Sequence, residues 1–219
     1  MPKKNCEIIS VDAQSPDQEI IDNAAALIKR GGLVVFPTST FYGLGVQAFD
    51  ANVVDRVFRV KERSRQKPLL ILIASMADLG PLVQSVPRMA IPLIQAYWPG
   101  HITLVFQATD VLPGNLTGYT GKIGIRLASH PVASALVRAV GSPITGTSAN
   151  LSGKAGCCEV AELDRKIMDQ ADLILDAGSL GGIGGSTVVD VTVDPPKILR
   201  EGVIRAEKLK ALLEGLNHA

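Results

Sequence analysis

Apolar residues recur at two spacings along this chain, and these spacings predict helices alternating with short strands. Between residues 20 and 28 the apolar side chains repeat at the spacing of one helical face, and Gly31 with Gly32 ends that helix. Short, mostly apolar runs predict strands at 33–36, 69–74, 102–107, 123–127, 143–147, 173–175, 187–191 and 197–199. The first two are expected to be buried on both faces. Further helices or helical turns are predicted at 52–60, 76–82, 88–97, 131–140, 160–168 and 206–213.

Helices and strands intermix over the whole length, without a repeat, a low-complexity linker or a break in composition. This pattern predicts the α/β class, with a twisted mixed β-sheet flanked by helices. We expect a single domain over residues 1–219, because the glycine-rich run at 178–185 is too short to be a linker between domains.

The composition is that of an ordinary globular protein, with 47% hydrophobic and 20% charged residues. The net charge is only +1, so the whole chain is not expected to attract nucleic acid. Aromatic residues make up 4%, which weakens any function that depends on stacking bases. The positive charge is instead local, since arginines and lysines crowd residues 56–67.

The cysteines and the N-terminal residues indicate where the protein works. Cys6, Cys157 and Cys158 have no metal-ligand spacing and form no disulfide framework, so we expect free thiols in a reducing compartment. Residues 1–7 are polar, and no apolar run reaches the roughly 18–20 residues that span a bilayer. We therefore expect a cytoplasmic protein without a signal peptide or a membrane partner.

Hydroxyl side chains follow the first apolar strand. Thr38, Ser39 and Thr40 come directly after it, at the strand end where α/β proteins tend to bind ligands. Gly43 and Gly45 permit close approach of the backbone to a ligand. The segment is also compatible with a plain polar turn. A dinucleotide fingerprint starting at Gly43 is disfavoured, because no helix opens directly after it.

A second motif gathers positive charge after the predicted helix at 52–60. Lys61, Arg63 and Lys67 lie in one loop, where their like charges repel unless an anion binds among them. Arginine binds phosphate with two parallel donors, and lysine acts as a mobile point charge. The loop therefore suggests a polyphosphate site. A solvated basic surface and a patch for RNA are the alternatives.

Single polar residues end several of the later strands. Ser148 and Asn150 lie two residues apart and so share one side of an extended segment, where both can bind phosphate, ribose or a base edge. Arg126, Ser186 and Arg200 each lie at a strand end. Taken alone, each of these is equally compatible with a polar turn or a surface ion pair. None of the histidines has partners at metal or catalytic spacing, so no metal site is predicted.

In their order and spacing, these segments resemble the YrdC/Sua5 (TsaC) family of threonylcarbamoyl-AMP synthases over about residues 17–205. The resemblance is carried by Pro37-Thr38-Ser39-Thr40, Tyr42-Gly43-Leu44-Gly45, Lys61-x-Arg63, Ser148-x-Asn150, Ser186-Thr187-Val188-Val189-Asp190 and Ile198-Leu199-Arg200-x-Gly202. It implies a YrdC-like fold with a concave basic cleft, of the short single-domain type without a C-terminal Sua5 domain.

The resemblance also implies a reaction. L-threonine, bicarbonate and ATP would condense to L-threonylcarbamoyladenylate and pyrophosphate, which is a nucleotidyltransferase reaction. The product would feed t6A37 biosynthesis in tRNA through a separate TsaD-type transferase complex, and direct tRNA binding is a weaker expectation. Mg²⁺ is expected to enter with ATP, without a dedicated protein site.

By similarity, the residues divide into two sets. Thr40, Arg126, Gly146 and Ser186 would bind L-threonine. ATP would be bound by Arg63, Lys67, Lys122, Ser148, Asn150, Gly156 and Arg200. Lys61 and Arg63 would be catalytic, acting on the phosphates and the departing pyrophosphate. Catalysis of this kind rests on positioning and charge neutralisation rather than on a side-chain acid or base.

Some positions depart from the family pattern. Ser39 replaces an acid, Leu72 lies where many members carry a histidine, and Glu201 replaces a proline. These departures keep two alternatives open. One is a YciO-like paralogue with different or weak activity, and the other is a non-catalytic RNA-binding module.

Overall fold

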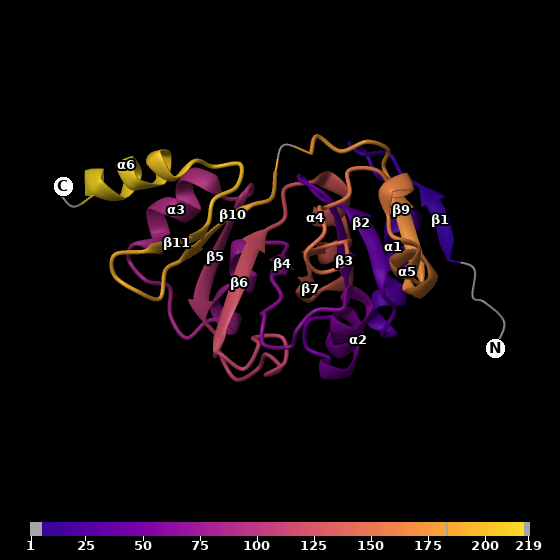
Figure 1. The fold of residues 1–219 in the computed structure, drawn as a ribbon, viewed down its shortest axis with the longest axis horizontal. Coiled ribbons are helices and arrows are strands. Elements are labelled where there is room, and N and C mark those ends of the chain that lie inside the picture. The colour runs from indigo at the N-terminus through magenta and orange to yellow at the C-terminus, as the bar shows by residue number, and fades with distance from the viewer. Residues whose placement is uncertain (1–5, 183, 217–219) are drawn as a thin grey trace.

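The computed structural model describes residues 6–182 and 184–216. Its strands form two sheets, which lie side by side in an elongated molecule with β1 at one end and α6 at the other (Figure 1). The five-stranded sheet has the order β1 (Glu7–Ser10), β9 (Leu173–Asp176), β2 (Val34–Pro37), β3 (Tyr42–Gly45) and β8 (Thr147–Ser148). The six-stranded sheet has the order β11 (Lys197–Arg200), β10 (Thr187–Asp190), β5 (Ile102–Gln107), β6 (Lys122–Leu127), β4 (Ile71–Ile73) and β7 (Ile144–Thr145).

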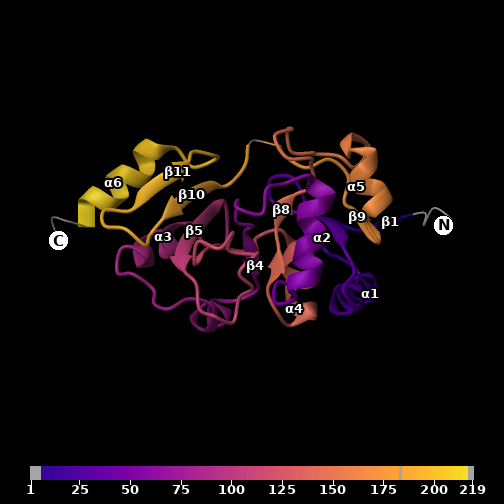
Figure 2. The same ribbon diagram turned by 60° about the horizontal axis from the view of Figure 1, so that its bottom comes forward.

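Helices cover both sheets. They are α1 (Gln18–Lys29), α2 (Ala51–Lys61), α3 (Ala90–Tyr97), α4 (Pro131–Val140), α5 (Arg165–Gln170) and α6 (Ala206–Leu216), with 3₁₀ turns at Met76–Asp78, Gly80–Leu82 and Val160–Glu162. In Figure 2, α1, α2, α4 and α5 surround the five-stranded sheet, while α3 and α6 lie beside the outer strands of the other sheet. Both sheets mix parallel and antiparallel pairs, so the predicted α/β class with mixed pairing is confirmed.

The apolar core joins the two sheets. Helices α1 and α4 pack on each other through buried residues such as Ile21 and Leu136. The same cluster includes Phe36 from the five-stranded sheet together with Leu72 and Ile144 from the six-stranded one. Burial of this continuous apolar surface fixes the two sheets relative to each other.

The chain passes from one sheet to the other at residue 146. A single strand was predicted at 143–147, and the structure replaces it with β7 and β8, which belong to different sheets. Thr145 is fully buried in β7, and its hydroxyl donates to Leu44 O at 2.8 Å, at the end of β3. The prediction of one sheet is therefore corrected to two sheets that meet at this crossing.

Several other elements differ from the prediction. Strands β1 and β3 were not predicted, since the glycines of β3 suggested a turn and β1 is an exposed edge strand of four residues. The helix predicted at 160–168 is a 3₁₀ turn followed by α5, because Asp164 caps α5 at its start. No helix in the described ranges is long and apolar enough to cross a membrane.

Candidate active site

A cavity of about 620 Å³ lies where the two sheets meet. Its wall takes residues from β3 and β8 of one sheet and from β5, β6, β10 and β11 of the other. Nine of the predicted site residues line it: Thr40, Arg63, Lys122, Arg126, Gly146, Ser148, Gly156, Ser186 and Arg200. The structure thus brings together positions that are up to 160 residues apart in the chain, from Thr40 to Arg200.

Three arginines of the cavity have no carboxylate partner. In the described part of the chain, Arg63, Arg126 and Arg200 take part in none of the salt bridges. Burial lowers the pKa of all three guanidinium groups, and the charge of Arg200 lowers the pKa of both Arg63 and Arg126 further. Three like charges that repel one another in one cavity define a site for anions.

Arg126 is the most deeply placed of the three. It is 5% exposed, and burial together with Arg200 lowers its pKa to about 10. One nitrogen donates to Ser39 Oγ at 2.6 Å, while the buried Nε has no hydrogen-bond partner among the residues that the structure describes. A buried donor without a partner is costly, so this nitrogen is a position for an acceptor from a ligand.

The other two arginines are held by backbone carbonyls. Helix α2 ends at Glu62 in the left-handed conformation, and this turn directs Arg63 back so that it donates to Lys67 O at 3.1 Å and Pro68 O at 2.8 Å. Arg200 on β11 donates to Ser186 O at 2.7 Å. Since carbonyls orient these side chains without neutralising them, the positive charge remains available to a ligand.

Hydroxyl groups surround the arginines. Thr40 is 6% exposed, with its Oγ1 3.3 Å from that of Thr38, and Ser186 Oγ lies 2.8 Å from Thr103 Oγ1. Hydroxyls can donate or accept, so they suit a ligand that carries both an amine and a hydroxyl. Thr38 and Thr103 line the cavity as well.

Lys122 differs from the arginines because it has an acid partner. Its Nζ lies 2.9 Å from Asp190 Oδ2, and Asp190 also accepts from Thr192 through its other oxygen. These hydrogen bonds offset the effect of burial and lower the pKa of Asp190. The Lys122 and Asp190 pair therefore forms a polar but nearly neutral part of the wall.

Lys61 lies behind the cavity rather than in it. The side chain is 2% exposed and does not line the cavity, and its ammonium donates to the carbonyls of Ser148 and Asn150. Burial and the charge of Arg63 lower its pKa to about 7. Lys61 was predicted to face the phosphates as a catalytic residue. In the structure its side chain lies outside the cavity wall and contacts the backbone of the segment that carries Ser148.

Two other predicted ATP-binding residues also lie outside the cavity wall. Asn150 is 8% exposed, accepts from the Ser148 hydroxyl and donates to Leu151 O and Lys154 O at 2.8 and 2.7 Å. Lys67 is exposed on the surface, and only its backbone carbonyl contacts Arg63. Asn150 thus shapes the loop that follows β8, and the Lys67 side chain is not part of this wall.

Two glycines are required by close packing at the wall. A Cβ atom at Gly146 would lie 2.6 Å from Leu72 Cγ, and one at Gly156 would lie 2.6 Å from Phe41 Cγ. Such distances are shorter than any normal contact. Both predicted site glycines therefore let the backbone itself form the wall of the cavity.

Other residues of the cavity were not predicted as site residues. Asp190, Lys154, Phe41 and Thr103 line it beside the predicted set. Asp190 lies within a segment that carries the family resemblance and Thr103 lies within a predicted strand, but their sequence context gives no sign of which strand face meets the cavity. Lys154 lies in a loop and Phe41 beside a turn, where no periodic pattern indicates direction.

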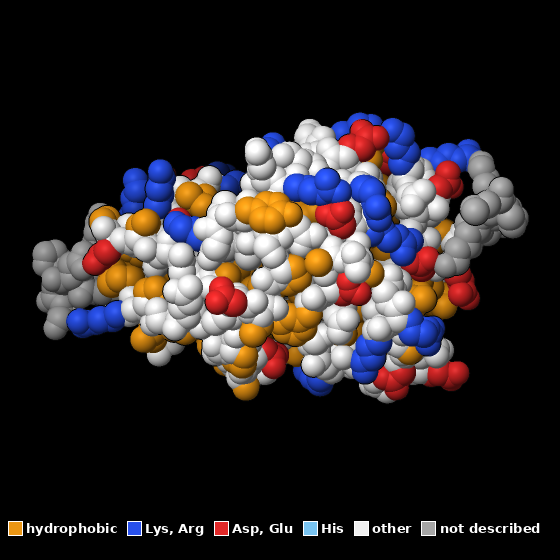
Figure 3. All heavy atoms as spheres, turned by 90° about the horizontal axis from the view of Figure 1, so that it is seen from below, with side chains coloured by type: hydrophobic (Ala, Val, Ile, Leu, Met, Phe, Trp, Pro, Cys, Tyr) orange, Lys and Arg blue, Asp and Glu red, His pale blue; other side chains and the backbone are white. Residues whose placement is uncertain are grey.

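The surface cations on α2 differ from those of the cavity. On the face shown in Figure 3, which carries α2, Lys and Arg side chains are interspersed with Asp and Glu. Arg56 pairs with Asp172 at 2.6 Å, and Arg65 pairs with Asp55 at 2.6 Å. Part of the positive charge in residues 56–67 is therefore compensated, and Arg63 is the cation of this stretch that lines the cavity.

The fold and the cavity define an α/β protein with a cavity between two sheets that is lined by three arginines. The Sua5/YciO/YrdC family model, described as telomere recombination, matches residues 26–202. The chain belongs to this family, and the predicted family resemblance is confirmed.

Relatives with similar sequences carry two kinds of name. Threonylcarbamoyl-AMP synthase of Pyrococcus abyssi is 36% identical over 190 residues, which is 87% of this chain and 56% of that protein. Threonylcarbamoyl-AMP synthase of Bacillus subtilis is 34% identical over 97% of this chain and 62% of that protein. The uncharacterized protein YciO of Escherichia coli is 31% identical over 88% of this chain and 94% of that protein.

Solved structures agree with this grouping. Sua5 of P. abyssi in complex with L-threonine superposes with a TM-score of 0.87 at 35% identity, over 94% of this chain and 60% of that one. E. coli YciO superposes with a TM-score of 0.83 at 29% identity, over 93% of this chain and 99% of the YciO chain. The chain thus spans less than two thirds of the Sua5 protein and nearly all of YciO.

Proposed function

We propose that this protein is an L-threonylcarbamoyladenylate synthase, which condenses L-threonine, bicarbonate and ATP and releases pyrophosphate. The observation that carries the proposal is the set of uncompensated guanidinium groups of Arg63, Arg126 and Arg200 in one cavity. The substrates bring a carboxylate and a triphosphate, which need this much positive charge. The names of the P. abyssi and B. subtilis relatives support the choice of reaction.

The amino acid belongs beside Arg126 in this proposal. A carboxylate fits the planar fork of a guanidinium, and it would give the buried Nε of Arg126 the acceptor that it lacks. Thr40 and Ser186 provide hydroxyls for the amine and hydroxyl of L-threonine. The backbone at Gly146 closes this side of the cavity without adding a side chain.

The nucleotide belongs beside Arg63 and Arg200. These arginines, with Lys122 and Ser148, provide the donors for phosphate oxygens, and Gly156 brings the backbone close to them. Lys61 and Asn150 keep the Ser148 segment in place from behind. ATP and L-threonine would then occupy adjacent parts of one cavity.

The chemistry needs charge neutralisation more than proton transfer. The neutral amine of L-threonine bonds to the carbon of bicarbonate, and one carbon–oxygen bond breaks as water leaves, which gives a carbamate. A carbamate oxygen then attacks the α-phosphorus of ATP. The bond from that phosphorus to the bridging oxygen breaks, and its electron pair leaves with pyrophosphate. Arg63 and Arg200 stabilise the negative charge that develops on the phosphate oxygens.

The residues present do not fit a protein-held metal ion. No group of three or more metal-ligating side chains occurs among the described residues. The acids of the cavity wall, Asp190 and Glu201, are paired with Lys122 and Arg205 at 2.9 Å each. We expect Mg²⁺ to enter as the complex with ATP, held by phosphates and water, and we assign no step to it.

The product is a reactive mixed anhydride, so a second enzyme must consume it. We propose that a TsaD-type transferase complex uses it to form t6A37 in tRNA. Direct contact with tRNA is not required for the reaction in the cavity.

The test is pyrophosphate release from ATP by the purified protein, with each co-substrate omitted in turn. We expect release only when L-threonine and bicarbonate are both present, with L-serine a poor substitute because it lacks the γ-methyl group. Release that is independent of L-threonine would overturn the proposal.

A YciO-like function is the second candidate, because YciO matches this chain over nearly all of its own length. For such a protein we expect ATP binding without release that depends on L-threonine. An RNA-binding module is distinguished by RNA binding that weakens with salt and that ATP does not displace.

A further inference from the structure

The loop between β8 and the 3₁₀ turn at Val160–Glu162 places one more cation at the cavity. Lys154 lines the cavity, as do Ser148 and Gly156. Its backbone is fixed from behind, because the buried Asn150 donates to Lys154 O at 2.7 Å. The loop therefore presents Lys154 at a defined place on the rim.

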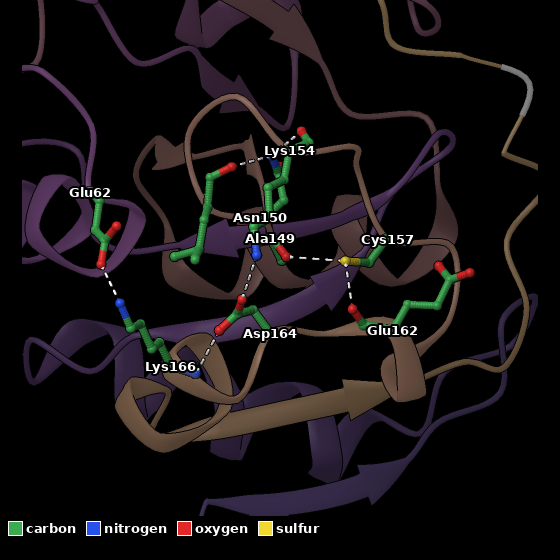
Figure 4. Close-up of polar contacts among 9 residues, drawn as sticks. Glu62, Ala149, Asn150, Lys154, Cys157, Glu162, Asp164 and Lys166 are labelled. Atoms are coloured by element: carbon green, nitrogen blue, oxygen red, sulfur yellow. Dashed lines mark hydrogen bonds and ion pairs between the residues drawn. The ribbon is translucent and has the colours of Figure 1, made fainter.

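The side chain of Lys154 is held by an exposed acid. Its Nζ lies 3.2 Å from Asp164 Oδ2, and the two side chains are 65% and 26% exposed. Figure 4 shows the other oxygen of Asp164 engaged by the backbone N–H of Lys166, at 3.0 Å, where Asp164 caps α5. An exposed pair of this kind contributes little stability, so an anion of higher charge can displace the carboxylate from the lysine.

Asp164 loses little when Lys154 leaves it. The pKa of Asp164 is lowered first by the hydrogen bond from the backbone of Lys166 and only then by Lys154. The carboxylate therefore stays ionised and keeps capping α5 without the lysine. The pair can open and close without disturbing the helix.

The other cations of the cavity lack this freedom. Arg63 and Arg200 are fixed by backbone carbonyls, and Lys122 is paired with Asp190, which is only 7% exposed. Lys67, which was predicted to act as a mobile charge on the phosphates, lies outside the cavity wall. Lys154 is the cavity cation whose partner is exposed and replaceable.

We propose that Lys154 leaves Asp164 to bind the terminal phosphates of ATP and the departing pyrophosphate. This inference rests on the proposed synthase function. The ammonium of Lys154 would offset the charge that the electron pair of the broken phosphorus–oxygen bond brings to pyrophosphate. Lys154 thereby acts on the leaving group.

The experiment compares Lys154→Met with Lys166→Met. The two lysines are matched, since both side chains are 65% exposed and each is paired with one acid, Asp164 or Glu62. Lys166 does not line the cavity. Three quantities are measured. The pyrophosphate-release assay gives kcat/KM for ATP and the KM for L-threonine, and calorimetry gives the Kd of inorganic pyrophosphate.

For Lys154→Met we expect kcat/KM for ATP and the affinity for pyrophosphate to fall about tenfold, with the KM for L-threonine unchanged. Lys166→Met should behave like the wild type, and Lys154→Arg should retain most of the affinity. Asp164→Asn, which keeps the cap and frees the lysine, should bind pyrophosphate at least as tightly as the wild type.

Equal pyrophosphate affinity in Lys154→Met and Lys166→Met would overturn the inference. So would an equal loss toward ATP and L-threonine, because that result indicates a disturbed loop. The calorimetric comparison separates this inference from the proposed function. The wild type could bind added pyrophosphate through Lys154 and yet form no pyrophosphate from ATP when L-threonine is supplied. In that case the synthase proposal fails and the phosphate-binding role stands.

Discussion

A guanidinium group that is 5% exposed has lost most of its hydration, and Arg126 regains little of it from the protein. Ser39 Oγ is its one side-chain acceptor among the described residues, and its Nε has none. A buried cation without an anion destabilises the fold. Such a residue is explained by a ligand that completes the pair, which makes Arg126 a residue of function rather than of stability.

This reasoning predicts opposite effects on stability and activity. Replacing Arg126 with Met should leave the free energy of unfolding unchanged or raise it, since an uncompensated buried charge is removed. The same change should lower kcat/KM for L-threonine roughly a hundredfold or more, because the carboxylate loses its partner. Urea unfolding and the pyrophosphate-release assay measure the two effects.

Arg138→Met is the control, since Arg138 is exposed on α4. This variant should change neither the free energy of unfolding nor kcat/KM for L-threonine. A large loss of stability in Arg126→Met, with activity lost only in proportion to the unfolded fraction, would contradict the assignment of Arg126 to substrate binding.

The buried amine of Lys61 predicts a dependence of stability on pH. Its pKa is about 7 in the folded protein against 10.5 for an ordinary lysine. Between these values the unfolded chain holds the proton and the folded protein has released it, so raising the pH from 7 to 10.5 stabilises the fold. A neutral amine still has two N–H groups for the carbonyls of Ser148 and Asn150.

Lys61→Met should therefore show a flatter rise of unfolding free energy over this pH range than the wild type, measured by urea titrations at several pH values. Its kcat/KM for ATP should also fall, because the Ser148 segment is no longer held. The unfolding free energy of Lys29→Met, at an exposed position of α1, should depend on pH as that of the wild type does. A slope in Lys61→Met as steep as that of the wild type would show that this amine is not the titrating group.

At the scale of elements, the crossing from β7 to β8 holds the cavity together. Thr145 N donates to Val46 O at 2.9 Å and Gly146 N donates to Leu70 O at 3.0 Å, so consecutive residues tie the crossing to both sheets. Ala149 N then donates to Tyr42 O at 2.7 Å on β3. The backbone here can approach both sheets only because Gly146 has no side chain.

Gly146→Ala should therefore destabilise the protein by about 1–3 kcal/mol, since the added methyl group meets Leu72 and Leu70. The KM for L-threonine should rise, because the wall of the cavity moves. Gly80→Ala is the control, as a Cβ atom there meets nothing within 4 Å. Chemical denaturation of both variants measures the difference, and equal stabilities would contradict the packing argument.

The elements with regular hydrophobic patterns could be predicted from the sequence. Helix α4 was predicted with its observed bounds, and α2 to within one residue at each end, because both have an apolar face at helical spacing and clear stop signals. The buried strands β2, β5 and β6 were predicted in the same way.

The elements that were missed depend on distant partners. Strand β3 contains two glycines, and its pairing with β2 and β8 determines its conformation. The division of 143–147 between two sheets depends on pairing with β4 on one side and β3 on the other. No local spacing indicates such a change of partner.

Only part of the candidate site was predicted, because the position of a side chain also depends on distant partners. Motif order named the polar residues, and most of them line the cavity. The direction of each side chain was not predictable, so Lys61, Lys67 and Asn150 were expected at the ligand and lie behind or outside the wall. Lys154 was missed, since its role depends on a loop fixed by Asn150 and on an acid in α5.

For the whole molecule, the arrangement of charge matters more than its sum. The net charge is +1, yet one cavity between the sheets concentrates three unpaired arginines. Surface cations such as Arg56 and Arg65 are matched by acids. This distribution favours small polyanions that can enter the cavity over long nucleic acids that bind a surface.

The most direct test of the whole account is a search for the product itself. The purified protein is incubated with ATP, L-threonine and ¹³C-labelled bicarbonate, and the adenylates are identified by mass spectrometry. The account predicts threonylcarbamoyl-adenylate that carries the label from the wild type and a greatly reduced amount from Arg126→Met. Consumption of ATP without any labelled adenylate, by a folded protein with Mg²⁺ present, would contradict it.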